Sequence, residues 1–222
     1  MKKIILITAS IVNAVISTFY IAASDYDTIP IHFNIHGEAD GFSSKWFMLT
    51  IPLIIIVMSI ANIFYEKHLE RKNKAAIKYQ SKASSAVFAF MIVIHWLLMS
   101  VCLSNNTYLN QEAFSLLSIM IGIAITYIGN LLGKIEQNPV IGVKTKATKN
   151  NKKVWKKTNR LGGLLGVISG IVFIICGILG FVIPSISTIL LLSAIIISIV
   201  FAAIIPTLYS RIIYSKENKN MS

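Results

Sequence analysis

The chain has 222 residues, of which 55% are hydrophobic and 14% are charged, and its formal net charge is +12. A water-soluble domain of this size carries about 25% charged residues, and the mean hydropathy of +0.71 also places the chain among membrane proteins. Its basic residues interrupt long apolar runs instead of covering a soluble surface, which excludes a soluble nucleic-acid-binding protein despite a pI near 9.7.

Six continuous apolar segments are long enough to cross a membrane. A bilayer core of about 30 Å needs roughly 20 apolar residues in a helix. Because the runs do not alternate with polar residues, they predict helices and not the strands of a barrel. We therefore predict an all-α membrane protein with six transmembrane helices. The predicted spans are residues 4–23, 47–65, 85–104, 113–133, 163–183 and 187–209.

The first of these spans has some features of a signal peptide. It begins with Lys2 and Lys3 and has small residues near Ala22. Its apolar run of about 20 residues exceeds the usual 7–15 of a cleaved signal, so we predict a retained membrane anchor. The predicted sidedness of the remaining chain is the same in either case.

Lysine and arginine are unevenly distributed among the segments that flank the spans. Twenty of the 21 lie at the N-terminus, in the 66–84 and 134–162 loops or after residue 210, and Lys45 is the exception. The positive-inside rule therefore predicts that both chain ends and both basic loops face the cytoplasm, an N-in/C-in topology. The predicted outer loops are residues 24–46, 105–112 and 184–186.

The predicted outer loops are net acidic, with five acidic residues against one basic residue. Acidic residues follow the sidedness rule weakly, so their gathering on one side has a neutral explanation. The alternative is that the outer surface meets a cationic partner such as a basic peptide, because complementary potentials speed encounter. The five residues are Asp25, Asp27, Glu38, Asp40 and Glu112.

The predicted spans lack Asp, Glu, Lys and Arg in their interiors. Such charges mark proton relays and ion pathways, so the pattern weighs against a proton-coupled transporter. With no HExxH motif and no embedded Asp pair, we predict that the protein is not an enzyme.

His95, beside Trp96, is interpreted as a neutral histidine bonded to a neighbouring helix, with pH sensing or ligand binding as the alternative. Pro206 should kink the sixth span.

Glycines recur every four residues in two of the spans. Gly162, Gly166 and Gly170 do so in the fifth span, and Gly129 and Gly133 do so in the fourth. Small residues at this spacing form a groove that lets another helix approach closely. We predict that the fourth and fifth helices pack together within the chain, with a dimer seam as the alternative.

The first outer loop contains an alternating pattern. Apolar residues occupy every second position from Ile29 to Ile35, which predicts a short strand or extended segment. The sequence GEADG that follows is typical of a turn. The fold class is thus six transmembrane helices plus a short extended segment in the first outer loop.

A metal site in this loop is not favoured. A histidine pair spaced by four residues binds a metal well on a helix, whereas Pro30 and Gly37 favour extended backbone here. Cys102 and Cys176 lie in apolar runs without a CxxC pair and are interpreted as buried apolar side chains. We predict neither a metal nor a cofactor. The four residues considered as metal ligands are His32, His36, Glu38 and Asp40.

The run IPIHFNIHGEADGFSSKW after the first span resembles a small bacterial membrane domain of unknown function. The pattern of that domain is Pro-x-His-[Phe/Trp]-Asn-x-x-Gly-x-x-Asp. In this chain it falls on Pro30, His32, Phe33, Asn34, Gly37 and Asp40.

The second half of the chain resembles the SdpI family. That family carries the pattern Gly-x-Arg-Thr-x-x-Thr, followed by Val-Trp-x-Lys-Thr-[Asn/His]-Arg-x-x-Gly. Lys144 replaces the usual Arg and Lys146 a usual Pro, and Lys lacks the planar fork for bidentate pairing with an anion. The matching residues are Gly142, Thr145, Thr148, Trp155, Lys157, Thr158, Asn159, Arg160 and Gly163.

The resemblance implies a toxin-immunity protein of the bacterial cell membrane, which protects cells from a secreted peptide toxin and also signals to a cytoplasmic transcriptional repressor. The alternative is a small polytopic transporter or exporter.

We divide the chain into an N-terminal two-helix unit (1–65), a basic loop with the third helix (66–112) and an SdpI-like region (113–222). The candidate toxin contacts are Pro30, His32, Asn34, Gly37, Glu38 and Asp40.

The 134–162 segment carries a net charge of +8. Binding to anionic lipid headgroups accounts for that charge. For the motif within it we predict either a structural clamp, in which Trp155 sits at headgroup depth, or a docking surface for a soluble partner. Gly142–Thr145 is superficially similar to the end of a phosphate-binding loop but lacks its glycines and strand. The candidate residues are Gly142, Lys144, Thr145, Trp155, Thr158, Asn159, Arg160 and Gly163.

Overall fold

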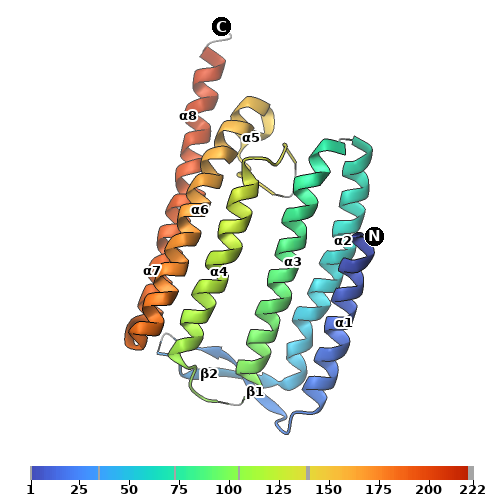
Figure 1. Ribbon diagram of the computed structural model, residues 1–222, viewed down its shortest axis with the longest axis vertical. Coiled ribbons are helices and arrows are strands. Elements are labelled where there is room, and N and C mark those ends of the chain that lie inside the picture. Colours follow the sequence, from blue (N-terminus) through green and yellow to red (C-terminus); the bar gives the residue numbers. More distant parts are fainter. Residues whose placement is uncertain (1, 35, 73, 105, 139–140, 220–222) are drawn as a thin grey trace. The chain divides into compact units, whose positions relative to one another are not determined.

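The computed structural model describes residues 2–34, 36–72, 74–104, 106–138 and 141–219. It is mostly helical, with one small sheet, and its elements are labelled in Figure 1. The chain forms two compact units. Unit 1 comprises Met1–Lys74 and Ser84–Ala113, and unit 2 comprises Ala75–Ala83 and Phe114–Ser222.

Unit 1 contains three long helices and a β-hairpin. The helices are α1 (Lys2–Ala22), α2 (Thr50–Lys72) and most of α3 (Lys74–Cys102). Strands β1 (Thr28–Phe33) and β2 (Ala39–Ser44) pair antiparallel, and the short 3-10 helix η1 (Lys45–Leu49) leads from β2 into α2. The hairpin lies at the end of the unit where α1 ends and α2 begins (Figure 1).

Unit 2 contains the remaining helices. Helix α4 (Gln111–Leu132) is followed by the short α5 (Lys146–Asn150) and by α6 (Lys152–Val182). The last apolar segment is built from four pieces, which are η2 (Pro184–Ile186), α7 (Ser187–Ser198), the π-helical turn η3 (Ile199–Ile204) and α8 (Ile205–Lys219).

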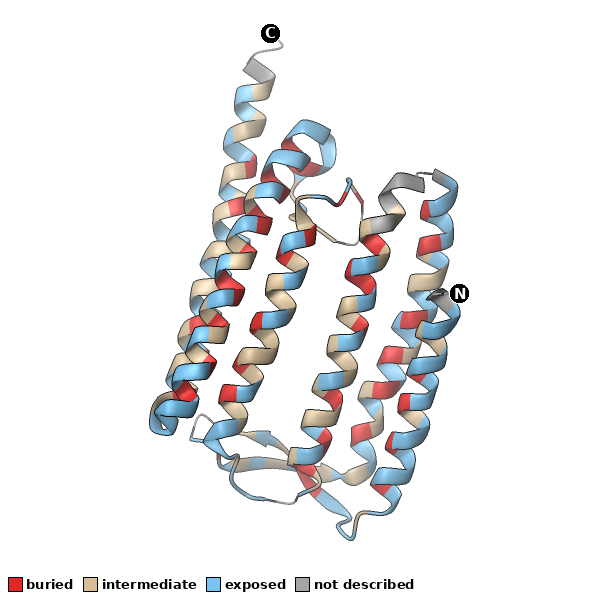
Figure 2. Cartoon of the chain, viewed as in Figure 1, coloured by how far each residue is buried: buried red, intermediate tan, exposed pale blue. Residues whose placement is uncertain are grey.

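Among the described residues, six helical segments are long and apolar enough to cross a membrane, which confirms the predicted all-α fold with six spans. Their outward faces are apolar: Phe19 is 73% exposed and Val182 is 71% exposed. Exposed positions run along much of each long helix (Figure 2), as expected where lipid covers the surface. The segments are Ile4–Ala22, Lys45–Arg71, Tyr79–Cys102, Gln111–Leu132, Lys152–Val182 and Pro184–Glu217. The N-in/C-in topology stays a prediction.

Two segments predicted as basic loops are largely helical. In the 66–84 segment, α2 continues to Lys72 and α3 begins at Lys74. In the 134–162 segment, α6 begins at Lys152, so the motif from Trp155 to Gly163 is its first turns and not a loop. We predicted loops because basic residues interrupt the apolar pattern of these segments. Lysine and arginine are nevertheless good helix formers, so the helices continue through them.

Glycines bring α4 and α6 into close contact, as predicted for the fourth and fifth spans. A Cβ atom at Gly163 would lie 2.6 Å from the carbonyl oxygen of Gly129, and one at Gly170 would lie 2.6 Å from that of Gly122. The contact is within the chain. Gly162 does not share this face, because its nearest neighbour is the side chain of Val143 at 3.0 Å.

Where we predicted a kink at Pro206, the structure has a change of helix type, and the kink itself stays a prediction. Residues Ile199–Ile204 form a π-helical turn directly before the α8 helix that contains the proline. Proline cannot donate to the preceding turn and its ring crowds that turn, so a local widening of the helix accommodates it.

Buried polar contacts join α1 and α3 inside unit 1. The hydroxyl oxygen of Ser17 lies 2.9 Å from Nε2 of His95, and Trp96 Nε1 donates a 2.8 Å bond to Oδ1 of Asn13. His95 is fully buried. This bonded histidine matches the first of its two predicted interpretations.

Candidate functional site

The predicted outer segment is one strand of a hairpin. Strand β1 is the alternating segment, and Ile29 and Pro30 on it are buried. The register pairs Thr28 with Ser44 and Pro30 with Phe42, and it is irregular around His32. The predicted turn over GEADG is displaced, because its last three residues belong to β2. Aspartate and glycine are poor strand formers, so the local pattern concealed this strand.

Asn34 organises the turn of the hairpin. Its Oδ1 accepts hydrogen bonds from the backbone N–H groups of His36 (2.9 Å) and Glu38 (3.0 Å). Its Nδ2 donates to the Glu38 carboxylate at 2.9 Å. Gly37 has a φ of 82°, a left-handed conformation that glycine adopts without strain. The Asn-x-x-Gly part of the motif is thus the chemistry of this turn.

His32 and Asp40, two further residues of the outer-loop motif, pair across the hairpin. Nδ1 of His32 lies 2.5 Å from Oδ1 of Asp40, and their side chains are 70% and 46% exposed. An exposed pair of this kind contributes little stability. Its effect is to hold the imidazole and the carboxylate together on the open surface.

The hairpin is anchored by the chain segment that precedes α4. Leu109 N–H donates to the carbonyl of Gly37 at 2.7 Å, and Ala39 N–H donates to that of Thr107 at 2.7 Å. Below the hairpin, Ile29 packs into an apolar core with Ile21 and Met99. The turn is therefore fixed from two sides, although its side chains are exposed.

The hairpin surface carries more exposed negative than positive charge. Lys45, the basic residue of the first outer loop, is held by a 2.9 Å bond to the carbonyl of Ser24 and lies 3.7 Å from Asp27. Its side chain is 12% exposed, whereas that of Asp27 is 98% exposed. The net acidity inferred from composition is thus a property of this surface.

The second candidate region, which we call the 142–163 cluster, is a compact arrangement of polar bonds formed by Gly142, Val143, Thr145, Thr148, Trp155 and Asn159. Thr158 is buried beside it without a hydrogen-bond partner for its hydroxyl among the described residues, and Gly163 packs against Gly129 of α4. Thr145 and Thr148 form a capping box at the start of α5. Thr148 also donates to the carbonyl of Val143 at 2.8 Å, and the Thr145 hydroxyl lies 2.9 Å from that of Ser210 on α8. These bonds tie the segment before α6 to the last helix.

Trp155 and Asn159, one turn apart on α6, close the cluster. Asn159 accepts a 2.7 Å bond from the backbone N–H of Val143 and donates a 3.0 Å bond to the carbonyl of Trp155. Trp155 donates from its indole nitrogen to the carbonyl of Ile135 at 3.0 Å. Gly142, with a φ of 135°, leaves room for them: a Cβ there would lie 2.6 Å from the Trp155 ring.

Trp155 does not face the lipid headgroups, and its depth in the membrane stays a prediction. Its side chain is 3% exposed and packs inside the protein. Asn159 and Thr158 are also buried, and Asn159 bonds the segment before α5 through the backbone N–H of Val143. Arg160 alone of the Thr158–Arg160 triplet is exposed. A buried tryptophan needs a partner for its N–H, and the carbonyl of Ile135 supplies it.

The fold brings together most, but not all, of each set of candidate residues. Pro30 is buried apart from the exposed side chains of the hairpin, and Gly163 packs against α4. Sequence reasoning missed the backbone partners of the two sets, namely Ile135, Val143 and Thr107, because a carbonyl or N–H partner leaves no mark on side-chain identity. Within the described part of the chain, His, Cys, Asp and Glu residues do not gather in threes in a way that could hold a metal ion.

Exposed basic residues surround the 142–163 cluster. Lys157 forms a 2.7 Å ion pair with Glu217 on α8. Lys144, which stands where the family has Arg, is exposed. Besides Lys157, the basic side chains exposed in this region are Lys144, Lys146, Lys149, Lys152, Lys153, Lys156 and Arg160.

The helices and their apolar surfaces define a multi-pass membrane protein. Residues 134–210 match the model of the SdpI/YfhL protein family, and residues 27–56 match a domain of unknown function, DUF1648. The chain is 24% identical over 222 residues to the Immunity protein SdpI of Bacillus subtilis (strain 168), covering 98% of this chain and 99% of that protein. These matches bear out the resemblance to the SdpI family that the motifs predicted and, together with the apolar helices, support a multi-pass protein of the bacterial cell membrane. No solved structure matches the chain.

Proposed function

We propose that this protein is a membrane immunity protein that protects the cell from a secreted antimicrobial peptide. The observation that carries the proposal is the similarity to the Immunity protein SdpI along almost the entire length of both chains. Similarity of that extent includes the hairpin and the 142–163 cluster, and not merely the apolar spans.

The hairpin supports a recognition role at the outer face in the predicted topology. Its turn is held by the side chain of Asn34, and its carboxylates at Glu38 and Asp40 are exposed. A rigid acidic surface attracts a cationic peptide and binds it without ordering a loop first. Protection would follow because a bound peptide cannot assemble in the lipid.

The 142–163 cluster supports a role on the cytoplasmic side in the same topology. Its buried polar bonds fix the start of α6, and exposed lysines lie around it. Such a surface suits anionic lipid headgroups or an acidic patch on a soluble protein. We propose that a cytoplasmic repressor docks there, a role that the family resemblance implies. Transport, the alternative function, gains no support from the described residues.

Deletion of the gene tests the immunity function. Deletion cells and their parent are challenged with a panel of bacteriocins, and survival is counted for each. The proposal predicts lower survival of the deletion cells for at least one bacteriocin, with recovery when the gene is restored. Equal survival across the panel would count against immunity. Cross-linking from the exposed lysines, with a soluble regulator recovered, tests the docking role separately.

A further inference from the structure

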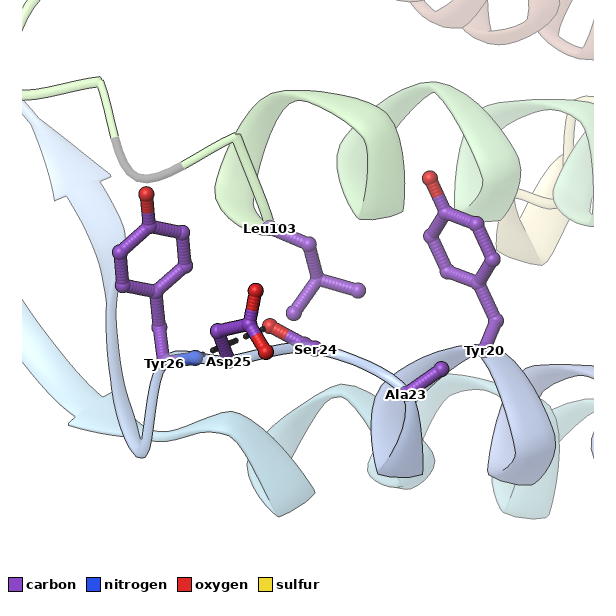
Figure 3. Close-up of a pocket in the computed structure, with 6 residues that line it drawn as sticks. All are labelled: Tyr20, Ala23, Ser24, Asp25, Tyr26 and Leu103. Carbon is purple, nitrogen blue, oxygen red and sulfur yellow. Dashed lines mark hydrogen bonds between the residues drawn. The ribbon is translucent and has the colours of Figure 1, made fainter.

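A pocket of about 240 Å³ lies in unit 1 where α1 ends and the chain turns toward β1. Figure 3 shows two tyrosine rings at its ends, with Asp25 and Ser24 between them. Leu103, at the end of α3, supplies an apolar wall. The lining residues are Tyr20, Ala23, Ser24, Asp25, Tyr26 and Leu103.

The carboxylate in this pocket is not neutralised. Asp25 is exposed and, among the described residues, takes part in no ion pair. Lys45 is close in the chain fold, but its ammonium is bonded to the carbonyl of Ser24 and faces Asp27. The C-terminal end of α1, at Ala22, adds the partial negative charge of a helix terminus. The pocket thus holds a carboxylate that has no ion-pair partner among the described residues.

The tyrosines give the pocket a second means of attracting a cation. An aromatic face binds a cation positioned within about 6 Å of the ring centroid. The Tyr20 ring is held edge-on against Trp96, at a centroid distance of 5.7 Å and an interplanar angle of 71°. Tyr26 is placed by the bond from its backbone N–H to the hydroxyl of Ser24 at 3.4 Å. Both rings are nearly half exposed.

We propose that this pocket binds the primary ammonium group of a lysine side chain carried by a cationic amphipathic peptide. The ammonium would meet the Asp25 carboxylate and the tyrosine faces, and the methylene stem would lie against Ala23 and Leu103. Lysines of a peptide lying in the membrane interface extend their charged ends toward water in this way. This inference rests on the proposed immunity function and names the chemistry of its recognition site.

Peptide binding to the full-length protein in nanodiscs tests the pocket. The probe is a short fluorescein-labelled amphipathic peptide of leucine and lysine, and the bilayer is phosphatidylcholine, which lacks a primary ammonium. We expect Asp25→Asn to weaken binding roughly tenfold, because a partly desolvated ammonium loses its carboxylate partner. The matched control is Asp27→Asn, which removes the same charge two residues away at a side chain outside the pocket, and it should change binding less than about twofold.

Tyrosine variants test the aromatic part of the site. Tyr26→Phe should bind like the unchanged protein, whereas Tyr26→Leu should bind several-fold more weakly, because only the latter loses the aromatic face. A peptide with acetylated lysines should bind all variants equally. Equal weakening by Asp25→Asn and Asp27→Asn would overturn the proposal, because it would show a general charge effect. The proposal would also fail if phosphatidylethanolamine in the disc removed the difference between Asp25→Asn and the unchanged protein.

The outcome is separable from that of the immunity test. If the pocket is not the recognition site, Asp25→Asn cells survive the bacteriocin like their parent, while deletion cells do not. If immunity is not the function, deletion and parent cells survive equally, whatever the nanodisc measurement gives.

Discussion

The indole nitrogen of Trp155 donates a 3.0 Å hydrogen bond to the backbone carbonyl of Ile135, twenty residues earlier in the chain. The bond joins the segment that leaves α4 to the second turn of α6, and both groups are buried. It gives Trp155 a role that phenylalanine, leucine or isoleucine could not fill at this position, because their side chains have no N–H donor. A buried carbonyl that loses its donor costs about 1 to 3 kcal/mol.

The Trp155→Phe substitution tests this bond. It keeps an aromatic ring in the same space but leaves the carbonyl of Ile135 without its donor, so we expect the free energy of unfolding to fall by about 1 to 3 kcal/mol. Denaturant unfolding of the purified protein in detergent measures the change. Lys156→Ala, at the exposed neighbouring position, is the control and should change stability by less than about 0.5 kcal/mol. Equal effects of the two substitutions would contradict the role of the bond.

The Gly142→Ala substitution should be more damaging than its size suggests. The φ of 135° is strained for alanine, and the added Cβ would lie 2.6 Å from the Trp155 ring. Backbone strain alone costs about 1 to 3 kcal/mol. Gly133→Ala is the matched control, because its Cβ would meet Arg160 at an ordinary 3.4 Å. We expect the thermal unfolding midpoint to fall for Gly142→Ala and to stay within a few degrees for Gly133→Ala. The reverse order would show that the turn at Gly142 does not require glycine.

The Gly170→Ala substitution tests the contact between α4 and α6. The added Cβ would collide with the Thr126 hydroxyl and lie 2.6 Å from the carbonyl of Gly122, so the helices would have to separate. Gly166→Ala, four residues away on the same helix, would meet Gly129 Cα at 3.4 Å and should be tolerated. We expect a loss of roughly 1 to 3 kcal/mol for Gly170→Ala, as for overpacking of a core. Unfolding in detergent distinguishes them, and equal stability would show that α4 and α6 are not in tight contact.

The Asn34→Ala substitution should release the turn of the hairpin. It removes the acceptor for the N–H groups of His36 and Glu38 and the donor to the Glu38 carboxylate. Hydrogen exchange at those two amides should quicken by about fivefold, since each lost bond weakens local protection by about 1 kcal/mol. His36→Ala is the control, because its exposed side chain takes no part in these bonds. Unchanged exchange in Asn34→Ala would mean that the turn is held by other contacts.

Much of the fold could be predicted from residue type. The features that were not predicted depend on contacts with residues far away in the sequence. The six spans follow from apolar length, and the glycine spacing indicated the contact of α4 with α6. Strand β2 was missed because Asp40 and Gly41 disfavour strands locally, and pairing with β1 overrides that preference. The burial of Trp155 was missed because its flanking lysines indicated a surface, whereas the backbone carbonyl that satisfies it carries no sequence signal.

Some candidate residues could be recognised from the motifs, whereas others are revealed only by the fold. Asn34, Gly37 and Gly142 were recognised from the family motifs, and the structure gives them conformational reasons: a side-chain-bonded turn and two positive φ angles. Asp25 and Tyr26 lie outside the motif, so motif matching did not select them as candidate contacts. Their proximity depends on how α1 ends, which only the fold reveals.

Survival of bacteriocin-sensitive cells that express this chain is the most direct test of the account. Cells carrying the unchanged protein, Asn34→Ala or an empty vector are challenged with the bacteriocin panel at matched amounts of protein in the membrane. The account predicts that the unchanged protein raises survival for at least one bacteriocin and that Asn34→Ala loses most of this protection. Survival equal to the empty vector across the panel, or full protection by Asn34→Ala, would contradict it.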